Sequence, residues 1–283
     1  MVIEYAPLED ELGDVLDKAM RHQGISEFTL ASTAQIPAER IRDAIDYRGD
    51  FSREELQRLA RALSLNEVGL QALAQGRYPR PEISGLPFCL YPLRTPHGIG
   101  VANAYLVAEC GSNTGVLFDA GLNYAQIRRV WPRSLVNLNA IFVTHVEQEH
   151  VGGLEALCKD YPAVPVFGPK AISSLPTHAT ALGEGSTLTF GRFQIQVRHT
   201  PGHVAAHNSY LVSVPSLPSG AAVFVSGDLL FAGSIGGAYH CHRQLRESLR
   251  RLANELPDST VIAPGHGPLT TLSNERQFNP FLL

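Results

Sequence analysis

Residues 141–154, with the sequence IFVTHVEQEHVGGL, constrain the fold of this chain more than any other stretch. Residues 141–144 are apolar or β-branched and predict a short buried strand. A loop follows at once, and Gly152 and Gly153 then allow a tight turn into a helix. Side chains on such a loop are held by a rigid scaffold yet remain open to solvent, as catalytic metal ligands usually are. Four candidate ligands stand on this loop: His145, Glu147, Glu149 and His150.

Three more candidate ligands stand at the ends of later predicted strands. They are His203, which ends the motif HTPGH, Asp228 in SGDLLF, and His266 in APGHGP. Each follows a run of apolar and β-branched residues, so we expect all of them to converge at one edge of a sheet structure. Together with the first loop they offer four imidazoles and three carboxylates. That number is too large for one tetrahedral ion and suits two metal ions.

The order of these motifs resembles the metallo-β-lactamase fold, whose signature at the first loop is His-x-His-x-Asp-His followed by two glycines. The resemblance covers residues 86–283 and implies an α+β fold in which an αββα sandwich holds two metal ions. It also implies the ligand sets and the catalytic residues. One ion would be held by His145, Glu147 and His203, the other by Glu149, His150 and His266, with Asp228 bridging, and Glu149 and Asp228 would act in catalysis.

Two departures from that signature bear on the metal. Glu147 replaces the second histidine, and Glu149 replaces the aspartate with a side chain one methylene longer. Hard carboxylate oxygens shift the preference of a site from zinc toward iron or manganese. The His-x-Glu pattern is also similar to the flavodiiron oxygen reductases of this superfamily. We therefore predict two divalent ions, with iron first and manganese or zinc as alternatives.

The last third of the chain points to a reaction class. The segments 231–236 and 270–281 are similar to stand-alone bacterial glyoxalase II-like hydrolases. This resemblance implies hydrolysis of a small acyl compound, a thioester or a lactone, by a hydroxide held between two metal ions. Two alternatives stay open: a diiron redox protein that reduces or senses oxygen, and a metal-dependent regulator that senses a ligand.

The substrate-facing loops depart from that family. Gly-Gly-Ala-Tyr at 236–239 stands where the family has Gly-Arg-Thr-Asp, and we expect loops 168–186 and 232–242 to form the leaving-group pocket. Asp119 is interpreted as structural support beside the metals, and His22 and His178 as surface residues. A solvated helix start is the simpler interpretation of the histidines around 240. The residues that we predict as substrate contacts or extra ligands are His97, Tyr239, His240 and His242.

Residues 1–76 predict helices only, and residues 77–85 form a linker rich in proline and glycine. Gly24 predicts a helix end, while Ser26, Ser52 and Asn66 predict helix caps and Pro37 a first helical position. The series resembles a phage-repressor-like helix-turn-helix domain. However, residues 1–80 hold ten lysines and arginines against 14 acidic residues. DNA is therefore an open but not a favoured partner, and docking, dimerisation or covering of the active site are the alternatives.

Composition sets the remaining expectations. The net charge is −4 and 44% of the residues are apolar, which is ample for a core and gives no general attraction to nucleic acid or membranes. The first residues lack the basic and apolar pattern of a secretory signal. Cys89, Cys110, Cys158 and Cys241 show no paired spacing, so we expect reduced thiols and a cytoplasmic location. The expected partner is a small-molecule substrate, with a homodimer left open.

Overall fold

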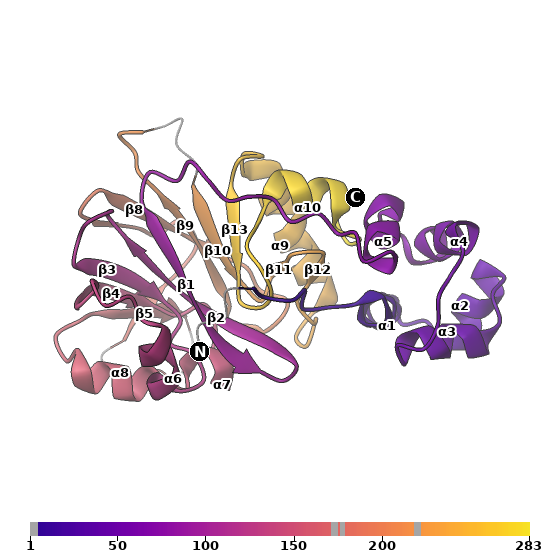
Figure 1. Ribbon diagram of the computed structural model, residues 1–283, viewed down its shortest axis with the longest axis horizontal. Helices are drawn as coiled ribbons and strands as arrows, with labels where there is room; N and C mark the ends of the chain where they lie inside the picture. Colours follow the sequence, from indigo (N-terminus) through magenta and orange to yellow (C-terminus); the bar gives the residue numbers. More distant parts are fainter. Residues whose placement is uncertain (1–4, 171–174, 176–178, 218–221) are drawn as a thin grey trace.

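The computed structural model describes residues 5–170, 175, 179–217 and 222–283. A group of helices comes first and a β-rich region follows, and the two lie side by side along the long axis of the molecule (Figure 1). The α+β prediction is confirmed. The position of His178 and part of the loop 168–186 lie outside the described residues.

The helical region consists of five helices whose ends follow the predicted caps. Ser26 accepts a hydrogen bond from the Thr29 N–H, and Asn66 accepts two from the following turn. Gly24 ends the first helix in the left-handed conformation (φ 65°). Pro37 is the N-cap of its helix, and its prediction as the first helical residue was wrong by one position. The helices are α1 (Leu12–Gln23), α2 (Glu27–Ala34), α3 (Ala38–Ile45), α4 (Arg53–Leu63) and α5 (Glu67–Ala74).

The arginines on and next to α3 are paired within the helical region. Arg40 forms an ion pair with Glu55, and Arg42 lies 2.9 Å from Glu27. Arg48 contacts two aspartates of the same segment. A helix that reads DNA keeps its basic side chains free for phosphates and bases. The helix-turn-helix resemblance and DNA binding therefore stay predictions, and these contacts do not favour DNA.

Two six-stranded sheets form the β-rich region. The first sheet has the order β1-β2-β3-β4-β5-β6 and the second β14-β13-β10-β9-β8-β7, and β11 pairs only with β12. Strand β2 pairs with β3, and β7 with β8, as antiparallel hairpins. The strands are β1 (Cys89–His97), β2 (Gly100–Ala108), β3 (Thr114–Phe118), β4 (Asn137–Phe142), β5 (Val166–Pro169), β6 (Thr180–Leu182), β7 (Thr187–Phe190), β8 (Phe193–His199), β9 (Asn208–Ser213), β10 (Val223–Gly227), β11 (Leu230–Phe231), β12 (Ser234–Ile235), β13 (Val261–Pro264) and β14 (Thr270–Thr271).

Helices cover the outer face of each sheet. Buried leucines of α8 (Leu154–Asp160), with Ile127 of α6 (Tyr124–Val130), pack on the first sheet. Leucines of α9 (His242–Glu255) pack on the second sheet, next to α10 (Leu272–Phe278). The inner faces of the two sheets meet in a core of aromatic and β-branched side chains. These layers are the predicted αββα sandwich (Figure 1).

The helical region is packed against the C-terminal part of the chain. The Asn66 N–H donates to the Pro280 carbonyl over 2.7 Å. A Cβ on Gly69 would lie 2.2 Å from the Phe278 carbonyl oxygen, so only glycine permits this approach of α5 to α10. Tyr78, within the predicted linker, is buried and donates to Glu275. The linker is thus part of the packing, and the boundaries at 76 and 86 stay predictions.

A buried ion pair joins α1 to the strand pair β11–β12. Lys18 and Asp10 pair with less than a tenth of each residue exposed. The Lys18 ammonium also donates to the Ile235 carbonyl over 2.6 Å, and the Ser234 hydroxyl donates to Asp10. Because the Lys18 ammonium, Asp10 Oδ2 and the Ser234 hydroxyl all have partners, the contact can be buried at low cost. The helical region is therefore joined to the strand pair β11–β12 by polar as well as apolar contacts.

Two of the cysteines form a disulfide, so the prediction of four reduced thiols was wrong for this pair. Cys89 and Cys110 are bonded with their Cα atoms 5.3 Å apart, and Cys158 and Cys241 are free. The antiparallel register that opposes Cys89 to Ala108 brings the two together, which a separation of 21 residues did not reveal. The disulfide removes the argument for the cytoplasm, which stays a prediction. No described helix is long and apolar enough to span a bilayer.

Candidate metal centre

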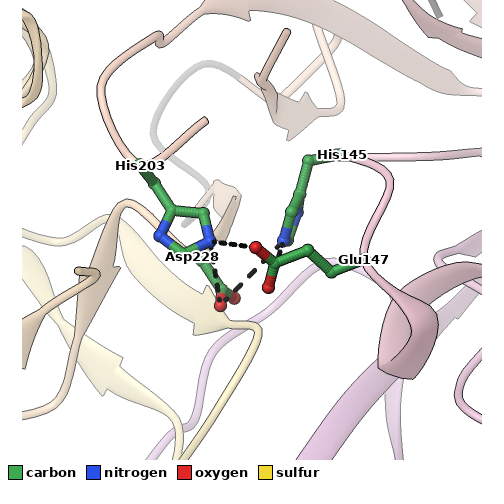
Figure 2. A group of neighbouring side chains, drawn as sticks. All are labelled: His145, Glu147, His203 and Asp228. Atoms are coloured by element: carbon green, nitrogen blue, oxygen red, sulfur yellow. Dashed lines mark ion pairs between the residues drawn. The ribbon is translucent and has the colours of Figure 1, made fainter. Parts of the chain in front are cut away.

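Four of the predicted ligands meet at the edge of the sandwich. Figure 2 shows His145 and Glu147 of one loop pointing toward His203 and Asp228, which come from two other segments. The Glu147 carboxylate lies 3.2 Å from His203 Nε2 and 3.8 Å from His145 Nε2. Asp228 Oδ2 lies 3.7 Å from His203 Nε2 and 4.0 Å from His145 Nε2. The glutamate that replaces the family histidine therefore reaches into the cluster.

The other predicted ligands form a second group, which also contacts Asp228. Glu149, His150 and His266 place their ligand atoms within 4.8 Å of one another. His150 Nε2 lies 3.4 Å from Asp228 Oδ1, and His266 Nε2 lies 3.3 Å from Asp228 Oδ2. Asp228 thus stands between two groups, and the seven predicted side chains are all brought together. Their role as metal ligands is a proposal.

Each of the four histidine rings is held by its Nδ1 atom. His203 Nδ1 donates to the Gly237 carbonyl over 2.8 Å, and His266 Nδ1 donates to the Val101 carbonyl over 3.0 Å. His150 Nδ1 donates to Asp119, while His145 Nδ1 lies 2.9 Å from the Thr144 hydroxyl. A proton fixed on Nδ1 leaves the Nε2 lone pair free for a metal. All four Nε2 atoms face the space around Asp228.

Asp119 has the supporting role predicted for it. Its carboxylate accepts hydrogen bonds from the Thr144 N–H over 2.8 Å, from the Thr144 hydroxyl over 2.9 Å, and from His150. The residue has φ 59°, a conformation that non-glycine residues rarely adopt. One carboxylate therefore orients two of the histidines, His150 directly and His145 through Thr144.

The residues present fit a pair of metal ions. Three Nε2 atoms, of His145, His150 and His203, and Asp228 Oδ1 are buried without a hydrogen-bond partner among the described residues. Buried polar atoms almost always have partners, because leaving one without costs about 1–3 kcal/mol. A Cβ on Gly265 would lie 2.1 Å from Asp228 Oδ1, so glycine keeps this space open. Nitrogen and oxygen donors in this number suit two divalent ions.

Electrostatics keep the carboxylates of the cluster ionised. Burial by itself would raise the pKa of Asp228, but His266 and His150 hold that pKa well below its usual range. The neighbouring His145 ring, and then that of His203, lower the pKa of Glu147. Burial opposes protonation of His266, yet Asp228 raises its pKa to about 9. Without metal, protons on the imidazoles balance the carboxylates, and metal binding must displace them.

His207 is a further supporting residue beside the cluster. Its Nε2 accepts the Asp228 N–H over 3.2 Å, and its Nδ1 donates to the Thr200 hydroxyl over 2.7 Å. Burial, and then His145, hold the pKa of His207 well below its usual range. It is thus a neutral ring whose two nitrogens are both engaged. It fixes the backbone of Asp228 and has no lone pair left for a metal.

A cavity of about 400 Å³ lies over the cluster. Of the predicted substrate contacts, His97, Tyr239 and His242 line it, while His240 is exposed and lies outside the described cavities. The His97 ring lies 3.6 Å from Glu149, and the Tyr239 ring centre lies 5.2 Å from that of His203.

One wall of this cavity comes from the N-terminal helical region. Glu9 and the α1 residues Asp14, Lys18, Arg21 and His22 line it. Glu9 Oε2 lies 3.7 Å from His266 Nδ1. His22 is half-buried and stacks on His242 with ring centres 4.4 Å apart, so its prediction as a surface residue was wrong. No local sequence signal marked these contacts, which depend on how the two regions pack.

The family model described as the metallo-β-lactamase superfamily matches residues 97–266. The chain belongs to this superfamily. Among curated relatives, the hydroxyacylglutathione hydrolase of Aeromonas salmonicida is 36% identical over 142 residues, 50% of this chain and 52% of that protein. That of Pectobacterium carotovorum is 37% identical over 141 residues. The matched part of the chain thus spans about half the length of these relatives.

Solved structures agree with the fold. The BLEG-1 B3 metallo-β-lactamase has a TM-score of 0.54 and 30% identity, over 69% of this chain and 99% of that one. TTHA1623, solved in a di-iron-bound form, has a TM-score of 0.52 and 30% identity, over 67% of this chain and 99% of that one. Both alignments cover about two thirds of this chain and nearly the whole of the compared chain.

Proposed function

We propose that this protein is a metal-dependent hydrolase of small acyl compounds, with thioesters as the first substrate class. His145, Glu147 and His203 would hold one divalent ion, and Glu149, His150 and His266 the other, with Asp228 between them. The observation that carries the proposal is that the Nε2 atoms of His145, His150 and His203, and Asp228 Oδ1, are buried without a hydrogen-bond partner in the part of the chain that the structure describes. Bound divalent ions would lower the pKa of a water molecule and polarise the substrate carbonyl.

The chain's own residues serve the reaction by holding charge and substrate in place. In hydrolysis a water oxygen bonds to the acyl carbon, the carbon–sulfur bond breaks, and the thiol leaves with a proton. Ionised Asp228 and Glu147 balance the positive charge that such a site needs. His97 and Tyr239 line the cavity over the cluster and are the proposed substrate contacts. Thioesters come first because relatives of this chain are hydroxyacylglutathione hydrolases.

The test is turnover of acyl thioesters and lactones by protein whose metal content is measured in parallel. We expect thioester hydrolysis that is lost on chelation and regained with iron, manganese or zinc. A protein that binds two ions but hydrolyses neither class would contradict the proposal.

A second candidate, a diiron redox protein, is favoured by one specific residue. Glu147 places a carboxylate where the family signature has histidine, and carboxylates favour iron. The di-iron-bound form of TTHA1623 shows that a chain of this fold can hold two irons. Oxygen consumption with a chemical reductant separates the two candidates. Consumption that exceeds thioester turnover and depends on bound iron would favour the redox protein.

A further inference from the structure

A second cavity, of about 390 Å³, lies between the helical region and α9. Its lining includes the apolar residues Leu63, Leu249 and Phe281 as well as the cationic residues Arg246 and Arg250. Its volume lies within the range of about 300–1,000 Å³ that small-molecule pockets have. Both regions contribute to it, so the cavity exists only because the helical region packs against the sandwich.

Two of the four arginines of α9, Arg246 and Arg250, line this cavity. Neither Arg246 nor Arg250 forms an ion pair or hydrogen bond within the described ranges, and both are exposed. They are four residues apart and therefore share one face of the helix. Acidic residues of α9 pair elsewhere, Glu247 with Arg243 and Glu255 with Arg198. Guanidinium groups that line a cavity without a partner are suited to bind a carboxylate or a phosphate.

This cavity adjoins the one over the metal centre. His22 and His242 line both cavities, and their rings stack at an interplanar angle of 26°. Burial, and then His242, lower the pKa of His22 to about 3, so this junction is uncharged at neutral pH. Ile235 lines the second cavity, and its carbonyl accepts the Lys18 ammonium from the first. The two cavities are therefore neighbours that share the stacked histidine pair.

We propose that the second cavity binds the anionic end of the substrate's leaving thiol, with Arg246 and Arg250 as the residues that recognise it. The inference rests on the proposed thioester hydrolysis and adds a substrate class: thioesters whose thiol carries a carboxylate or a phosphate. The apolar residues of the lining contact the body of the thiol. The N-terminal helical region thus completes the substrate site rather than acting apart from it.

The kinetic test uses three thioesters that share one acyl group and differ in the thiol: coenzyme A with phosphates, glutathione with carboxylates, and uncharged N-acetylcysteamine. In the double variant Arg246→Gln/Arg250→Gln we expect KM for one or both anionic thioesters to rise roughly tenfold to a hundredfold, as for loss of charge-assisted hydrogen bonds. We expect kcat to stay within about twofold and the N-acetylcysteamine thioester to be unaffected. Arg243→Gln is the matched control, because this arginine lies on the same helix with its side chain 83% exposed and outside the cavity lining.

A binding test separates this inference from the proposed function. Metal-free full-length protein is titrated calorimetrically with S-methyl-coenzyme A and with S-methylglutathione. Binding of either compound that weakens tenfold or more in the double variant, and not in Arg243→Gln, supports the site even if no thioester is hydrolysed. The relative strength of the two identifies phosphate or carboxylate. Hydrolysis of all three thioesters with equal kcat/KM, or binding that the double variant leaves unchanged, would overturn the inference while the hydrolase proposal stands.

Discussion

Arg40 and Arg42 of the helical region and Arg246 and Arg250 of α9 are used in opposite ways. Arg40 and Arg42 form ion pairs with glutamates of neighbouring helices, so their positive charges are balanced within the fold. Arg246 and Arg250 have no such partner where the chain is described, and both line a cavity. The same contrast separates the buried Lys18–Asp10 pair, which has hydrogen-bond partners, from three histidine Nε2 atoms and Asp228 Oδ1, which have none among the described residues. Satisfied charges hold this structure together, whereas unsatisfied ones mark where it binds other molecules.

The largest effect expected from this comparison is that of Asp228→Asn. The change removes the negative charge between the two ligand groups, and Asp228 is almost fully buried. We expect thioester hydrolysis to fall by about 10³-fold, since metal ions contribute several kcal/mol to such reactions, and metal content to fall with it. Turnover and metal analysis measure both.

Asp160→Asn is the control, because Asp160 accepts a hydrogen bond from Tyr124 away from the cluster. Near-normal turnover and metal content in Asp228→Asn would contradict the claim that the unsatisfied polar atoms around Asp228 mark a binding site.

The next effect is on stability. Lys18→Met leaves the buried carboxylate of Asp10 without its cation, and a buried pair broken in this way costs about 3–5 kcal/mol. The free energy of unfolding from urea titration measures the loss. The double variant Asp10→Asn/Lys18→Met removes both charges and should recover most of it. A single variant that costs under about 1 kcal/mol would show that α1 is not held to β12 by this pair.

The parts of the molecule that could be predicted from sequence are those with local signals. The seven candidate ligands stand in short motifs at strand ends, and the helix caps at Ser26, Ser52 and Asn66 depend on a few neighbouring residues. The cavity wall made by Glu9 and α1 depends instead on the packing of distant segments, as does the disulfide. Even the replacement of histidine by Glu147 could be placed, because its motif fixes its position.

A smaller effect is expected for Arg40→Ala. Its pair with Glu55 lies at the surface, with 44% of the arginine side chain exposed, so the loss of stability should be about 0–1 kcal/mol. Thioester KM should not change, in contrast to the α9 double variant. Thermal unfolding and steady-state kinetics test both statements, and a change in KM would remove the distinction between the two sets of arginines.

The smallest effect concerns pH. Burial, and then His242, lower the pKa of His22 to about 3, from an ordinary value of 6.5. Below pH 6.5 His22 binds a proton in the unfolded chain but stays neutral in the folded protein. The free energy of unfolding therefore decreases as pH falls from 6.5 toward 3. His22→Leu should therefore lose less stability than the wild type between pH 7 and pH 5, by under about 1 kcal/mol after solvent screening.

His240→Leu is the matched control for His22, because His240 is exposed. Equal pH dependence of unfolding in the His22 variant and the wild type would show that His22 is not buried against α9 in solution.

The most direct test of the central claim is anomalous scattering, at the iron, manganese and zinc edges, from crystals of metal-loaded protein. We predict two peaks, one beside His145, Glu147 and His203 and one beside Glu149, His150 and His266, with Asp228 contacting both. Crystals that show no metal in this cluster after loading, or Glu147 and Glu149 turned away from it, would contradict the account.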